Sequence, residues 1–140
     1  MSDGTPWRPV VHVKDVCSAF IAGVEAPSSI VSARAFNVGI PNGNFTVRDI
    51  AEAAQRAVPG CELIFTGEHS DPRTYRVSFN RILTELKDYY RPEWSLDRGG
   101  RELKELYDRI HFTEEQLTVI QNWLQCLNAS SHMRVTLEKI

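Results

Sequence analysis

The sequence predicts a mixed α/β (α+β) fold that is rich in helices and has only a few short strands. Capping residues followed by apolar residues at helical spacing recur along the chain, whereas strand-like patterns are short and separated by these helices. The composition, 42% hydrophobic and 24% charged, is typical of a globular protein. The 140 residues suffice for one ordinary domain.

The first expected elements are a short buried strand over Val10–Val13 and a helix over 16–26 with Asp15 as its N-cap. Helical spacing predicts a buried face that carries Val16, Ala19, Phe20, Gly23 and Val24.

A second strand is expected at Ala35–Val38. Thr46 and Asp49 then form a capping-box pattern, which predicts a helix that ends before Pro59-Gly60. Its expected buried stripe is Ile50, Ala53, Ala54, Ala57 and Val58.

Two more strands are expected, at Glu62–Phe65 and at Tyr75–Phe79, where apolar and polar residues alternate. Asn80 is expected to cap a short helix, and Ser95 is expected to cap another. The residues expected inside are Ile82, Leu83 and Leu86 for the first, and Leu96, Gly99, Gly100, Leu103, Leu106, Tyr107 and Ile110 for the second.

A capping box at Thr113 and Gln116 predicts a last helix. Its apolar stripe is Leu117, Ile120, Leu124 and Leu127. We therefore expect one domain over residues 1–128 and a loosely ordered tail over 129–140.

Charge and motif absences limit the function classes. A net charge of −2 argues against a nucleic-acid partner that is bound by bulk positive charge. There is no secretory signal and no apolar run near 20 residues, so we expect a cytoplasmic protein without a membrane partner. The three cysteines indicate neither a disulfide framework nor a metal site, and no two histidines have metal-ligand spacing.

Arg8 and Arg73 are the candidate binding residues. Each lies at the edge of an expected ordered segment, and two guanidinium forks can clamp a diphosphate. From the residues alone, two surface arginines remain the alternative. His12 lies in an apolar run and is expected to be a hydrogen-bonded structural histidine.

The sequence contains no glycine-rich phosphate loop and no Tyr-x-x-x-Lys. We therefore expect no cofactor-binding residue and no catalytic residue in this chain.

Four blocks in order resemble the extended short-chain dehydrogenase/reductases, and more narrowly the C-terminal substrate-binding part of NAD-dependent nucleotide-sugar epimerases and dehydratases. The blocks are GTPWRPVVHVKDV, AFNVGIPNGNFTVRDIAEAA, DPRTYRVSFNRILTEL and RPEWSLDRGGRELKE, which span roughly residues 3–110. The resemblance implies a substrate lobe without a complete Rossmann fold. It also implies that Arg8 and Arg73 contact the diphosphate of a nucleoside-diphosphate sugar, with Asn37 and His12 in structural roles.

The departure from this family is the lack of the Rossmann half, so NAD or NADP is expected only with a partner that supplies it. The leading hypothesis is a substrate-binding lobe, present as a fragment or as half of a split enzyme, that is not catalytic alone. The alternative is a non-catalytic dimeric interaction module derived from that lobe. A small independent enzyme that uses carboxylates such as Asp71, Glu114 or Glu115 is the least favoured.

Overall fold

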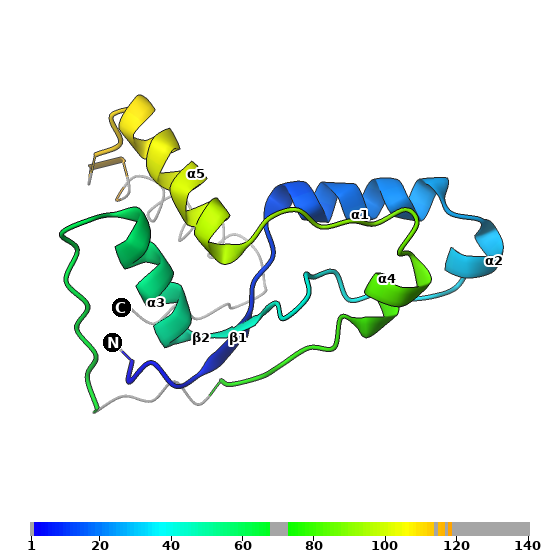
Figure 1. Cartoon of the computed structure of the whole chain (residues 1–140), viewed down its shortest axis with the longest axis horizontal. Helices are drawn as coiled ribbons and strands as arrows, with labels where there is room; N and C mark the ends of the chain where they lie inside the picture. The colour runs from blue at the N-terminus through cyan, green and yellow to red at the C-terminus, as the bar shows by residue number, and fades with distance from the viewer. Residues whose placement is uncertain (1, 68–72, 114, 117, 119–140) are drawn as a thin grey trace, which may run out of the picture. The chain divides into compact units, whose positions relative to one another are not determined.

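The computed structural model describes residues 2–67, 73–113, 115, 116 and 118, and it shows a helix-rich mixed α/β fold in this part of the chain (Figure 1). The elements are β1 (Trp7–Pro9), α1 (Val13–Glu25), α2 (Ser28–Val31), β2 (Asn44–Thr46), α3 (Val47–Ala57), α4 (Asn80–Glu85) and α5 (Leu96–Arg109). The described residues do not form a complete Rossmann fold, as the sequence predicts. The chain divides into two compact units, Met1–Glu102 and Leu103–Ile140.

The sheet consists of β1 and β2, which pair antiparallel with Arg8 opposite Phe45. The strand predicted at Val10–Val13 is therefore misplaced, because pairing begins three residues earlier, at Trp7. This pairing depends on a partner segment more than 30 residues away that carries no strand pattern of its own.

The other three predicted strands are wrong, because 35–38, 62–65 and 75–79 form no ladder in the structure. At Val77 a side chain takes the place of a neighbouring strand. The Asn44 amide accepts from the Val77 N–H at 2.8 Å and donates to the Val77 carbonyl at 2.9 Å. These two bonds satisfy the backbone N–H and carbonyl of Val77 without a ladder.

Helix α1 begins three residues before the predicted start, and His12 is its N-cap, with Nδ1 accepting from the Lys14 N–H at 3.2 Å. Asp15 is not the cap. It is buried, and its carboxylate accepts the N–H groups of Glu93 and Trp94 at 3.0 and 3.1 Å. This anchor turns Asp15 and the alanines of α1 inward.

The predicted buried face of α1 is consequently wrong in part, since Ala19 is buried but Phe20, Gly23 and Val24 are exposed. The physical reason is that the inward-facing carboxylate has specific hydrogen-bond partners. Apolar spacing alone does not reveal such partners.

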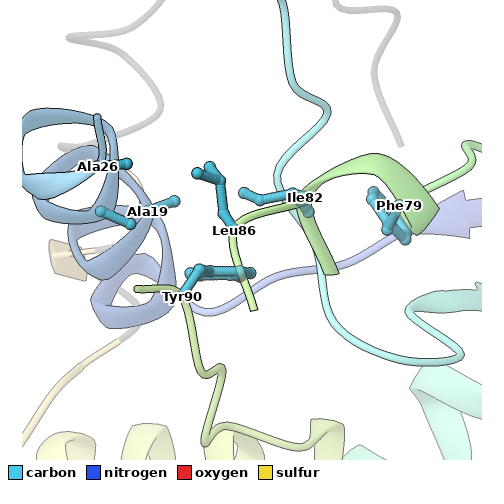
Figure 2. Close-up of a cluster of buried hydrophobic side chains, with 7 residues drawn as sticks. Ala19, Ala26, Phe79, Ile82, Leu86 and Tyr90 are labelled. Carbon is cyan, nitrogen blue, oxygen red and sulfur yellow. The ribbon is translucent and has the colours of Figure 1, made fainter. Parts of the chain in front are cut away.

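The core lies between α1 and α4 (Figure 2). Its members are Ala19, Ala22, Ala26, Phe79, Ile82, Leu86 and Tyr90. The predicted burial of Ile82 and Leu86 is confirmed, and Leu83 packs partly buried against the same cluster. The Tyr90 hydroxyl donates to the Gly39 carbonyl at 3.1 Å, which ties the core to the segment before β2.

The capping predictions for α3 and α5 are confirmed, whereas the prediction that Asn80 caps α4 is wrong, because the N-cap is Phe79 and no side chain caps this helix. The Thr46 hydroxyl accepts from the Asp49 N–H at 3.1 Å, and the Asp49 carboxylate accepts from the Thr46 N–H at 2.7 Å. Ser95 Oγ accepts from the Arg98 N–H at 3.2 Å. Only Ala53 of the stripe predicted for α3 is fully buried. The sequence predicts that Leu103, Leu106 and Tyr107 of α5, and Ile110 just after it, point inward, but they are exposed.

The third capping box is present in part, because the Thr113 N–H donates to Gln116 Oε1 at 3.0 Å. The apolar stripe predicted to follow it and the predicted tail over 129–140 lie outside the described residues. The single-domain assignment over 1–128 stays a prediction.

Candidate functional site

The two candidate arginines, 65 positions apart in the sequence, meet in the structure. Arg8 lies in the middle of β1, and its Nη1 donates to the Arg73 main-chain carbonyl. The same Nη1 donates to the Trp7 carbonyl at 2.8 Å. The contact therefore joins the Arg8 side chain to the main chain of Arg73 and holds residue 73 beside β1.

A third arginine and two aromatic rings lie next to this contact. The guanidinium carbon of Arg8 is 5.9 Å from the centre of the Tyr75 ring. The guanidinium carbon of Arg76 is 4.0 Å from the centre of the Trp7 ring. Both distances are in the range of cation–π contact. We call Arg8, Arg73, Arg76, Trp7 and Tyr75 the arginine cluster.

Two hydrogen bonds from backbone N–H groups hold the segments of the arginine cluster together. The Trp7 N–H donates to Thr74 Oγ1 at 3.0 Å, and the Tyr75 N–H donates to the Trp7 carbonyl at 3.4 Å. Arg73, Tyr75 and Arg76 are exposed. Three arginines, one half-buried in β1 and two exposed at 73 and 76, therefore lie on neighbouring segments of a chain whose net charge is −2.

Sequence reasoning missed Arg76 and the two aromatic residues as neighbours of Arg8. The alternation over 75–79 contained a signal, because it puts Arg76 on the face opposite Tyr75 and Val77. The side of the segment that faces Trp7 depends on the tertiary contact with β1, which the pattern does not specify.

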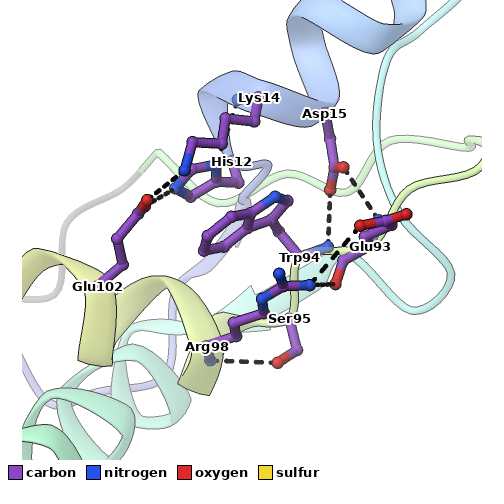
Figure 3. Close-up of polar contacts among 8 residues, drawn as sticks. All are labelled: His12, Lys14, Asp15, Glu93, Trp94, Ser95, Arg98 and Glu102. Carbon is purple, nitrogen blue, oxygen red and sulfur yellow. Dashed lines mark hydrogen bonds and ion pairs between the residues drawn. The ribbon is translucent and has the colours of Figure 1, made fainter.

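His12 makes the structural contacts expected of it (Figure 3). Its Nε2 lies 2.7 Å from Glu102 Oε2, and its ring stacks on Trp94 with 3.9 Å between centroids. Since Nδ1 accepts from the Lys14 N–H, Nε2 is the donor to Glu102. His12 thereby connects the start of α1 to α5.

Two cations flank the same indole. Lys14 Nζ lies 4.4 Å and the Arg98 guanidinium 4.1 Å from the centre of the Trp94 ring. The hydrogen bond from Lys14, with a smaller contribution from His12, holds the pKa of the Glu102 carboxyl below its usual value. Every charged group here has a partner within the cluster, which indicates a structural role.

Asn37 also makes a structural contact, donating from Nδ2 to the Ser78 carbonyl at 3.2 Å. It borders a pocket of about 200 Å³. The other lining residues are Pro9, Val10, Val11, Val38, Val77 and Phe79. Apart from Asn37, this pocket is lined by apolar side chains. Three of the lining residues, Pro9, Val10 and Val11, come directly after Arg8 in the sequence.

A larger pocket of about 360 Å³ lies between the 40–45 segment, α3 and the start of α5. Three of its lining residues are carboxylates, Asp49, Glu52 and Asp97, and its cation Arg56 is paired with Asp97 at 2.7 Å. This charge balance disfavours a phosphate, so the arginine cluster is the better candidate for an anion.

Other site types were also sought. Within the described residues, no group of three or more His, Cys, Asp or Glu side chains is arranged to hold a metal ion. No helix in that part of the chain is both long and apolar enough to span a bilayer.

Two glycines lie close against other parts of the chain. A Cβ added to Gly39 would lie 2.3 Å from the Phe79 ring, and one added to Gly43 would lie 2.9 Å from the Ile40 carbonyl oxygen. These close approaches are filled by the chain itself. The sequence lacks the glycine fingerprint of a dinucleotide site, and the expectation that this chain holds no cofactor-binding residue stays a prediction.

Comparison with known proteins gives one family match. The model of the NAD dependent epimerase/dehydratase family matches residues 1–39. The matched segment contains Arg8, His12 and all of α1, and it does not reach Arg73. No solved structure matches the chain.

Proposed function

We propose that this chain is the nucleotide-sugar-binding lobe of an NAD-dependent epimerase/dehydratase-like protein and that it is not catalytic alone. The observation that carries the proposal is the contact between Arg8 and Arg73, next to Arg76. The family match over the segment that contains Arg8 supports the likeness to the epimerases and dehydratases.

The arginine cluster suits a diphosphate for a physical reason. A guanidinium group donates two parallel hydrogen bonds to phosphate oxygens, and bonds to a charged acceptor are stronger than bonds to a carbonyl. A diphosphate would accept such paired bonds from the Arg8 guanidinium, whose Nη1 donates to the Trp7 and Arg73 carbonyls in this structure. Tyr75 and Trp7 hold the guanidinium groups by cation–π contact.

The sugar chemistry requires a partner. Hydride transfer to and from the hexose needs a nicotinamide and a Tyr/Lys pair, neither of which this chain's residues provide. The role of the chain in such an assembly is to bind and orient the substrate. NAD or NADP would bind to the partner.

Titration calorimetry with nucleoside diphosphates and their sugars tests the proposal. We expect Arg8→Ala and Arg73→Ala each to weaken binding about tenfold or more, as for loss of charge-assisted hydrogen bonds. Arg8→Lys keeps the charge but loses the fork, so it should bind with intermediate affinity. Arg101→Ala, at an exposed position on α5, is the matched control and should bind like the wild type.

Two results would overturn the proposal. One is no binding by the chain either alone or with a Rossmann-half partner. The other is binding that both Arg8→Ala and Arg73→Ala leave unchanged while circular dichroism shows both variants folded. A thermal shift with NAD alone is expected to show no stabilisation.

A further inference from the structure

Helix α1 is apolar on two opposite faces. From Val16 to Val24 it contains no charged residue. One face packs in the core through Ala19 and Ala22, and Figure 2 shows Ala19 and Ala26 directed toward Leu86. A helix that is apolar all round is normally buried all round. The opposite face of α1 is not.

That opposite face carries large exposed side chains. Val13 is 66%, Phe20 74% and Val24 86% exposed, and Cys17 between them is also exposed. We call Val13, Cys17, Phe20 and Val24 the outer stripe. At about 100° per residue the four side chains fall within roughly 60° of one another, so they form one continuous line.

The spacing of the outer stripe is that of a helix–helix seam. Its intervals of four, three and four residues are those of the apolar positions in a coiled coil, over about 17 Å of helix. This order is the same in both directions. A second copy that runs antiparallel therefore places Val13 opposite Val24 and Cys17 opposite Phe20, and each apolar residue faces an apolar one.

The charges at the two ends of α1 favour the same arrangement. Lys14, which also pairs with Glu102, precedes the uncharged stretch and Glu25 follows it, and both are exposed. In an antiparallel pair Lys14 of one copy lies near Glu25 of the other at both ends of the contact. In a parallel pair like charges would face each other, which is unfavourable.

We propose that the outer stripe of α1 is a homodimer contact in which two copies of this chain pair their α1 helices antiparallel about a two-fold axis. Such a contact is isologous, which is the commonest symmetry of soluble oligomers. One pair of short helices is a small interface, so the dimer should form in a concentration-dependent way. The contact is separate from the arginine cluster and does not depend on the proposed function.

Sedimentation equilibrium on the full chain tests this proposal with matched variants. Phe20→Lys puts a charge in the centre of the stripe, and Ile64→Lys puts the same charge at a position that is also 74% exposed but lies outside α1. We expect the wild type and Ile64→Lys to dimerise alike. Phe20→Lys should need at least a tenfold higher concentration to dimerise, with an unchanged circular dichroism spectrum.

Crosslinking determines the register and direction. In a background with Cys17, Cys61 and Cys126 replaced by serine, Val13→Cys and Val24→Cys chains are mixed and treated with an oxidant. The antiparallel contact predicts disulfide-linked heterodimers. Links of Val24→Cys chains to themselves would instead indicate a parallel pair and overturn the proposal.

A wild type that stays monomeric at all concentrations would also overturn it, and so would Phe20→Lys dimerising like the wild type. Equal loss of dimer in Ile64→Lys would show that the effect is not specific to α1. Nucleotide binding by the folded Phe20→Lys variant reports on the proposed function separately.

Discussion

Replacing Asp15 with asparagine should destabilise the protein strongly, because its buried carboxylate joins α1 to the segment before α5. Asp15 is 3% exposed and accepts hydrogen bonds from the N–H groups of Glu93 and Trp94 (Figure 3). Asparagine keeps one acceptor oxygen, and its NH₂ group faces a backbone N–H that then has no partner. A lost bond to a charged acceptor and an unpaired buried donor together cost about 3 kcal/mol, after the gain from removing a buried charge.

Urea unfolding at neutral pH, followed by circular dichroism, measures this loss, and a thermal scan should show a Tm lower by roughly 10 °C. Asp97→Asn is the control with identical chemistry. Asp97 pairs with Arg56 at the surface, so its replacement should cost less than about 1 kcal/mol. Equal losses in Asp15→Asn and Asp97→Asn would refute the anchoring role of Asp15.

Two further changes test local packing and capping. Thr46→Ala should cost about 1 kcal/mol at pH 7, because it removes the N-cap of α3. The hydrogen bonds from the Thr46 hydroxyl and N–H hold the pKa of Asp49 below its ordinary 3.8. The stabilisation from Asp49 is therefore complete above that value and is lost as the pH falls through the lower folded-state pKa, so urea titrations near pH 3 should show a smaller penalty for Thr46→Ala than at pH 7. An equal penalty at both pH values would contradict this linkage. Gly39→Ala should lose about 1–3 kcal/mol because its Cβ would lie 2.3 Å from the Phe79 ring, whereas Gly23→Ala, with no atom within 4 Å, should gain about 0.5–1 kcal/mol from helix propensity. If the two variants changed the free energy of unfolding in the same direction relative to the wild type, the Gly39 contact would not be tight.

The parts of the fold that local chemistry specifies are predictable from the sequence. The capping box at Thr46 and the Ser95 cap appear where their patterns predict, since each cap needs only residues within one turn. Ile82 in α4 and Leu86 just after it are buried, as their apolar spacing predicts. A helix signal contains its own hydrogen-bond partners.

The predicted strands fail because a strand takes its partners from distant segments. The run at Val10–Val13 looks like a strand, yet β1 forms at Trp7–Pro9, where Asn44–Thr46 is the partner. The apolar and polar residues that alternate over 75–79 also look like a strand, but there the Asn44 side chain, and not a neighbouring strand, bonds the Val77 backbone. No pattern within either segment specifies which distant group will be there.

The candidate site divides in the same way. The sequence by itself singled out Arg8 and Arg73 and determined the helices that flank them, because residue type, caps and spacing are local properties. Only the tertiary structure brought Arg8 against the Arg73 carbonyl, added Arg76 and Tyr75, and turned Phe20 and Val24 of α1 outward. These contacts and the outward direction of Phe20 and Val24 depend on which distant groups form hydrogen bonds with buried polar atoms such as the Asp15 carboxylate. Those hydrogen bonds form only when the distant segments have folded together.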